Sequence, residues 1–414
     1  YDSAYFHLFN SYAADSNCQA GRSLVELLVA TSHFKEATNL LNQLIVKYPN
    51  NLELSALKPK VMPDQSDAFL SGERREHFVV SYYENTWPRS GSRVYIADPL
   101  VHYQMGYNNK RASVEVGKVA DFVRTSPDDM VRCVATMLQK QEKYLGILAP
   151  RLSALHKLSM SKEFWRRSLS ICFERNIGLV YEMFQILEAN FNPKEHFCRI
   201  LSPDSYHVPL DFDEQRYFLE HWSYGREQML SCYLEEFYPG DSPQIQGRFN
   251  SPYKVREIGS PNSNNPVVGI MGAFFAGKFH NQLIEQSAGR VNVIGFHRAL
   301  PIDTAAIDWR AREFLTRPVA GFDRFDRFFF RTLKALMPRV FVEYLPQLLG
   351  HLDAQFAPLT NLKYVVSEMW IGEAYEPVAL ALLKETRGVQ TIYNEHNINV
   401  HPYKASLLPR WASY

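Results

Sequence analysis

The chain has 414 residues, of which 46% are hydrophobic and 14% aromatic, and its formal net charge is +1. That length predicts two or three domains, since one domain takes roughly 100–200 residues, and the composition excludes a disordered chain. A charge so close to zero provides no overall field to attract nucleic acid or an anionic membrane. The longest apolar run, around residues 266–277, is too short to span a bilayer. Five scattered cysteines without a CxxC pair are typical of a reduced cytosolic protein without a zinc site.

Residues 20–50 predict a helical hairpin. Four of its positions have spacings similar to those of a tetratricopeptide unit: Ala37, Leu41, Leu44 and Pro49. An ordinary helical hairpin is the alternative interpretation. Because a single repeat cannot bury its own apolar face, we expect a tetratricopeptide-like segment over residues 1–58 that either continues in more repeats upstream or docks on the next domain. Such a segment could also recruit a protein partner.

A polar, proline-containing linker is expected over residues 59–73, followed by an α/β domain over residues 74–414. The first predicted strands are His77–Tyr83 and Arg93–Ala97. A large helical insertion then runs over about residues 114–238, and its last long amphipathic pattern extends from Asp211 to Phe237.

From Val267 onward, strands and helices alternate. Strands are predicted at residues 267–271 and 291–296, and helices near residues 281–287 and 322–337. Alternation of this kind is typical of a parallel sheet with helices on both faces, so the predicted fold class is α/β with one Rossmann-like sheet.

The last segment predicts a strand at residues 362–367, a helix at 373–387 and a strand at 389–393. Two strands joined by a crossover helix must be parallel neighbours. Glu368 follows the first strand, and Glu395, His396 and Asn397 follow the second. Ligands of open α/β sheets bind outside the carboxyl ends of the strands, so these residues fall where such a sheet has its site.

This cluster suggests acid–base chemistry. A carboxylate beside His396 can tune the imidazole as a base near neutral pH. Glu368 is suited to bind a sugar hydroxyl while Trp370 stacks on the ring, and His401 completes the group. Two histidines five positions apart on a loop do not have the helical spacing of a zinc protease, so no metal is predicted. The alternative is a strand end whose polar groups only satisfy the loop backbone.

Two further motifs have competing interpretations. Gly272–Lys278 has the spacing of a phosphate-binding P-loop, but Phe279 replaces the magnesium-binding hydroxyl, and an ordinary strand-to-helix turn is favoured. After Gly321, four basic residues recur at helical spacing and form a basic stripe: Arg324, Arg327, Arg331 and Lys334. The stripe either binds a phosphate or is a solvated helix face, and the solvated face is favoured. His297 is a weaker candidate at a strand end, and Asp98 and Glu84 are interpreted as turn formers.

Several stretches together resemble transferases encoded in bacterial surface-polysaccharide (O-antigen) gene clusters. The matching pieces are residues 84–87 (ENTW), 148–166 with His156 and Trp165, 363–371 (KYVVSEMWI) and 392–403 (IYNEHNINVHPY). The resemblance covers about residues 75–403. Departures occur at Ser170–Phe173, where the family tends to have a Gly-Pro-Trp-like turn, and at Lys404–Ser406, where it tends to have Gly-Asn.

The resemblance implies a glycosyltransferase-like enzyme with two Rossmann-type domains of GT-B type, of which this chain carries the N-terminal half and the donor half follows Tyr414. It implies a nucleotide-sugar donor, a glycan or lipid-linked acceptor, no further cofactor, and a cytoplasmic location at the inner membrane. Glu395 or His396 would activate the acceptor, with Glu368, Trp370, Asn397, His401 and His156 binding it. The rivals are a non-catalytic scaffold with helical repeats and a P-loop phosphotransferase.

Overall fold

The computed structural model describes the chain in segments. These are residues 18–30, 34–48, 76–88, 93–98, 115–120, 127–221, 223–240, 242–251, 265–271, 278–294, 306–368 and 376–394, with single positions 51, 54, 57 and 101. Within these segments, no helix is long and apolar enough to cross a membrane.

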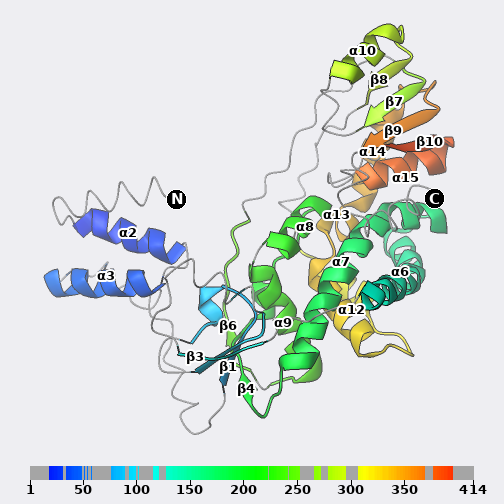
Figure 1. The fold of residues 1–414 in the computed structure, drawn as a ribbon. Coiled ribbons are helices and arrows are strands. Elements are labelled where there is room, and N and C mark those ends of the chain that lie inside the picture. The colour runs from blue at the N-terminus through cyan, green and yellow to red at the C-terminus, as the bar shows by residue number, and fades with distance from the viewer. Residues whose placement is uncertain are drawn as a thin grey trace.

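The N-terminal segment is the predicted helical hairpin, made of α2 (Cys18–Ala30) and α3 (Phe34–Lys47) (Figure 1). Its own small core joins the apolar stripes of the two helices and includes Leu24, Leu28, Leu41, Leu44 and Leu57. The apolar residues recur every three or four positions, which puts them on the facing sides of the two helices.

The first sheet has four parallel strands in the order β3-β2-β1-β4. They are β1 (Glu76–Val79), β2 (Arg93–Ile96), β3 (Glu115–Val119) and β4 (His196–Phe197). The prediction of helix from about residue 114 is therefore wrong at its start. The short run EVGKV becomes a strand because it pairs with β2, and such tertiary pairing overrides weak local propensity.

A helical body separates this sheet from the second one. It contains α6 (Pro127–His156), α7 (Lys162–Asn190), α8 (Phe212–His221), α9 (Ser223–Phe237), α11 (Trp309–Thr316), α12 (Arg324–Leu336), α13 (Arg339–Val342) and α14 (Leu345–Phe356). The single pattern predicted from Asp211 to Phe237 is two helices, α8 and α9. A two-stranded parallel sheet pairs β5 (Ile200–Leu201) with β6 (Gln244–Ile245), so the predicted insertion is also interrupted by strands.

Local capping explains two of the helix starts. The hydroxyl of Ser161 accepts a hydrogen bond from the Phe164 amide at the start of α7. At α12, Asp323 and Asp326 form a reciprocal capping box, which satisfies two backbone donors at once.

The second sheet has the order β10-β9-β7-β8, again entirely parallel. Its strands are β7 (Val268–Met271), β8 (Val291–Val293), β9 (Tyr364–Glu368) and β10 (Gln390–Asn394), with α10 (Lys278–Gln286) after β7 and α15 (Glu376–Arg387) after β9. Helix α15 ends at Gly388, whose φ of 66° is readily adopted only by a residue without a side chain. The expectation of one sheet is therefore corrected to two, which lie at opposite ends of the helical body in Figure 1.

One continuous apolar core runs through the helical body and reaches both sheets. It includes Phe78 and Tyr95 of the first sheet, Met271 and Val365 of the second, and the aromatic stripe of α12 between them. Helix α7 contacts α6, α8, α9, α12 and α15, so it is the central support of this core.

Candidate functional site

The second sheet reverses its strand order between β7 and β9. From β7 the chain crosses to β8 on one side, and it later returns to β9 on the other side and continues to β10. Met271 and Ser367 are register partners at the carboxyl ends of these strands. Crossovers that leave in opposite directions open a crevice above such a strand pair, which is where open α/β sheets bind ligands.

The predicted parallel pairing of the last two strands is confirmed. Ser367 lies opposite Tyr393, and Glu368 lies opposite Asn394, the residue before Glu395. Neighbouring strands are about 4.8 Å apart, so the backbones of Glu368 and Asn394 end the two strands side by side.

Most of the predicted site side chains lie outside the described residues. This holds for Trp370, Glu395, His396, Asn397 and His401, and also for the side chain of Glu368, whose backbone is described. The Gly272–Gly277 loop and His297 lie outside as well, while Lys278 is the first residue of α10. The described backbone thus pairs Glu368 with Asn394, and the roles assigned to the other residues stay predictions.

One polar contact at this edge was missed by sequence reasoning. The buried hydroxyl of Ser367 donates to a carboxylate oxygen of Glu376 at 2.7 Å, and Glu376 is itself only 2% exposed at the start of α15. A carboxylate at a helix N-terminus is stabilised by the helix dipole. The signal in the sequence was an acidic residue in the first turn of the predicted helix, directly after the strand end.

The first sheet has the same kind of reversal, between β1 and β4, and its carboxyl edge is fully described near Ser81. The Ser81 hydroxyl donates to Glu227 of α9 at 2.5 Å and accepts from the Tyr83 amide at 3.0 Å. The Trp87 indole donates to the Ser81 carbonyl at 2.8 Å. Ser81 and Glu227 are each 1% exposed, so this cluster is part of the interior.

Asp98 and Glu84, interpreted as turn formers, differ in the structure. Glu84 does begin a turn, the 3-10 segment η2 (Glu84–Thr86). Asp98 is buried and forms an ion pair with Arg226 of α9. Burial lowers the pKa of the Arg226 guanidinium. Helix α9 therefore supplies the partners for the polar groups at this edge.

The basic stripe on α12 is neutralised by four glutamates. Arg324 pairs with Glu188 at 2.7 Å, Arg327 with Glu236 at 2.6 Å and Arg331 with Glu235 at 2.7 Å. Lys334 pairs with Glu313. Pairing on this scale supports the solvated-face interpretation over a phosphate grip, because each cation already has a carboxylate partner.

Asp326 belongs to a separate buried cluster. Its fully buried carboxylate accepts hydrogen bonds from Lys140, Lys143 and Tyr144 of α6. Burial alone would raise the pKa of Asp326, but these bonds outweigh it and lower the pKa to about 2. The cluster joins α6 to α12.

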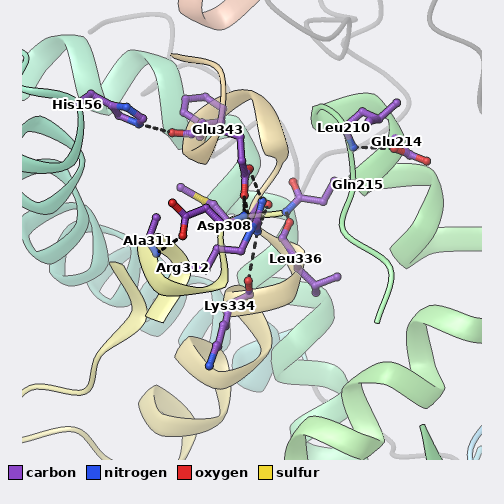
Figure 2. A network of polar contacts seen from close by, with 12 residues as sticks. His156, Leu210, Glu214, Gln215, Asp308, Ala311, Arg312, Lys334, Leu336 and Glu343 are labelled. Carbon is purple, nitrogen blue, oxygen red and sulfur yellow. Dashed lines mark hydrogen bonds and ion pairs between the residues drawn. The ribbon is translucent and has the colours of Figure 1, made fainter. Parts of the chain in front are cut away.

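His156 and Arg312 belong to a network that holds the helical body together (Figure 2). The His156 Nε2–H donates to the Phe341 carbonyl at 2.7 Å, and burial lowers the pKa of this imidazole. Arg312 is 0% exposed and makes a two-pronged ion pair with Glu343, at 2.8 and 2.7 Å, while its Nη1 donates to the Met337 carbonyl. The contacts of His156 are thus with α13, and its substrate-binding role stays a prediction.

Among the described residues, no group of three or more His, Cys, Asp or Glu side chains has the geometry of a metal site. Cys198 and Cys232 are free and buried, and burial raises the pKa of each thiol to about 12. A thiol with so high a pKa is a poor nucleophile at neutral pH.

A comparison with protein-family models matches residues 76–406 to the LIC12162 family transferase. The chain belongs to this family. The match extends over both parallel sheets and the helical body of this LIC12162 family transferase, and the N-terminal hairpin precedes it. Comparisons with curated proteins and with solved structures found no match. The coarser part of the resemblance, membership of a transferase family, is thereby confirmed.

Proposed function

We propose that this LIC12162 family transferase is glycosyltransferase-like and moves a sugar from a nucleotide-activated donor to a glycan or lipid-linked acceptor in surface-polysaccharide assembly. The observation that carries the proposal is the register of β9 and β10, which sets Glu368 beside the backbone that leads to Glu395 and His396. The transferase family match and the strand reversal at β7 and β9 support it.

The proposed step needs a base and a stabilised leaving group. Glu395 or His396 accepts the proton of the acceptor hydroxyl as its oxygen bonds to the anomeric carbon of the donor. The bond from that carbon to the phosphate oxygen breaks, and the nucleoside diphosphate leaves with the bonding electrons. Glu368, Asn397 and His401 bind hydroxyl groups of the acceptor, Trp370 stacks on its ring, and His156 supports the site from the helical body.

The partners in this proposal are the nucleotide sugar and the acceptor, with no additional cofactor. We expect the reaction on the cytoplasmic side, at the inner membrane when the acceptor is lipid-linked. A protein partner bound through the N-terminal hairpin would recruit the enzyme to its acceptor.

The test is a transfer assay with the full-length protein. UDP-, GDP- and dTDP-linked sugars are incubated with a bacterial glycolipid extract, and release of the nucleoside diphosphate is followed. We expect Glu395→Gln and His396→Ala each to lower turnover by about 10²–10⁴-fold, the range for loss of a general base, with an unchanged melting temperature.

Glu285→Gln is the matched control, because Glu285 is an exposed carboxylate on α10 of the same sheet. Equal turnover in Glu395→Gln, His396→Ala and the control would remove both residues from the mechanism. A wild-type chain that transfers no sugar from any donor would favour the scaffold alternative.

A further inference from the structure

A cavity of about 210 Å³ lies between three segments of the helical body. The 3-10 segment η3 (Pro203–Ser205) forms one wall, the start of α11 a second and the last turns of α12 a third. Its main lining side chains are Pro203, Asp204, Tyr206, Trp309, Arg331 and Lys334. Pockets for drug-sized ligands take about 300–1,000 Å³, so this one suits a single small ring.

The walls are held in place by contacts outside the cavity. Asp308 caps α11 by accepting from the Ala311 amide at 2.9 Å. Arg312 of α11 donates to the Met337 carbonyl at the end of α12 and pairs with Glu343 at the end of α13. In Figure 2 the Lys334 side chain points away from this network, while its carbonyl accepts from Arg312. On the other wall, Tyr224 donates to the Ser205 carbonyl at 2.6 Å. The cavity is therefore preorganised.

The indole of Trp309 gives the cavity a flat apolar surface. It is 38% exposed, although a tryptophan is among the side chains with the most apolar area to bury. A ring that stacks on this face would cover the exposed area.

The polar groups around the indole carry both signs of charge. Arg331 and Lys334 are cationic, but each is paired with a glutamate, Glu235 and Glu313 respectively. Asp204 is exposed and makes no hydrogen bond or ion pair within the described residues. The carboxylates of Asp204, Glu235 and Glu313 therefore outnumber the cations Arg331 and Lys334. The cavity has no excess positive charge that would select an anionic ligand.

Tyr206 adds a buried hydroxyl to the lining. Its oxygen is shielded from solvent, and Glu235, which is paired with Arg331, lies within hydrogen-bonding reach of it. A phenol hydroxyl both donates and accepts, so Tyr206 also offers an acceptor to a sugar hydroxyl in the cavity.

We propose that this cavity binds an uncharged pyranose unit of the acceptor or product glycan. A pyranose presents an apolar face of C–H groups, which matches Trp309, and hydroxyls that both donate and accept, which match Asp204, Arg331 and Tyr206. The inference rests on the proposed sugar transfer. Figure 1 shows α12 well apart from the strands of the second sheet, so the unit bound here is not the one that reacts.

The test titrates the full chain with neutral methyl glycosides of glucose, galactose and mannose and with N-acetylglucosamine, followed by tryptophan fluorescence and ligand-observed NMR. Inorganic phosphate and glucuronate serve as anionic probes. We expect saturable binding of at least one neutral sugar. Its affinity should fall at least tenfold in Trp309→Ala and several-fold in Tyr206→Phe, and recover in part in Trp309→Phe. Glu285→Gln should bind like the wild type.

Transfer kinetics separate this inference from the proposed function. With a long glycan acceptor, Trp309→Ala should raise KM with little change in kcat, because the interaction is made equally in the ground and transition states. Intact sugar binding without any transfer would refute the proposed function and leave the cavity assignment standing. Equal sugar binding in Trp309→Ala and wild type, or binding of phosphate alone, would overturn the assignment.

Discussion

The two parallel sheets have the same kind of strand reversal but different carboxyl edges. In the first sheet, α9 brings Arg226 and Glu227 against Asp98 and Ser81, so the polar groups at the edge bind one another. In the second, the described edge contains the Ser367–Glu376 contact and ends with the pair Glu368 and Asn394. Equal topology therefore does not give equal surroundings, because α9 packed over the first edge turns its polar groups into interior contacts.

The largest expected difference between the two sheets is in the pH dependence of their stability, and it comes from His77 in the first sheet. Burial lowers the pKa of this imidazole to about 4, although its hydrogen bond to the Thr86 carbonyl opposes the shift. Between pH 6.5 and about pH 4, His77 is therefore protonated in the unfolded chain but neutral in the folded chain. Stability is thus full above pH 6.5 and falls by about 3 kcal/mol as the pH drops towards 4.

Hydrogen exchange at pH 7.5 and 4.5 would measure this effect. Protection of the β1 and β2 amides should fall more than protection of the β7 and β9 amides, and His77→Gln should flatten the difference. The same pH dependence in wild type and His77→Gln would show that His77 is not its source.

Glu227→Gln should show that the first edge is structural. The amide can still accept from Ser81, but it replaces one buried carboxylate oxygen by an N–H₂ group that can only donate, which costs about 2 kcal/mol. The melting temperature should fall while kcat stays within about twofold for the folded protein, because turnover is proposed at the other sheet. The comparison variant Asp353→Asn breaks a surface pair with Arg387 and should cost less than about 1 kcal/mol. A large loss of kcat in Glu227→Gln would make the first edge part of the site.

The smallest effect on stability is expected from adding a methyl group to Gly269 on β7. A methyl group at Gly269 would lie 2.5 Å from the buried side chain of Ile294 and 3.1 Å from Leu362. Gly269→Ala should destabilise the second sheet by about 1–2 kcal/mol, the usual cost of overpacking. Gly146→Ala, in α6 with open space around it, should instead stabilise by up to about 1 kcal/mol. Thermal denaturation of both variants would check the opposite signs.

Short-range patterns predicted the second sheet well. The strand, helix and strand from residue 362 to 393 appear as β9, α15 and β10, and the helix ends at Gly388 as predicted. Apolar periodicity and a terminating glycine act within one turn or one strand, so they are visible in a local window. The edge that carries the predicted Glu368–Glu395 cluster follows from the crossover rule alone.

Other features were beyond local patterns. Residues 115–119 form a strand because β2 lies beside them, and the 211–237 pattern divides into α8 and α9. Ser81 and Glu227 are 146 positions apart, and Arg312 and Glu343 are 31 apart. The sequence around one member of such a pair therefore does not predict the other. The four glutamates that neutralise the α12 stripe come from α7, α9 and α11.

The sequence by itself determined the element types, the parallel direction of the last strands and the residue types available at their ends, because these depend on interactions between near neighbours. Only the tertiary structure decided that the strands divide into two sheets, that one polar edge is buried under α9, and that Trp309 stays exposed beside a cavity. Those outcomes depend on which distant surfaces pack together, and packing is selected by the burial of the whole core.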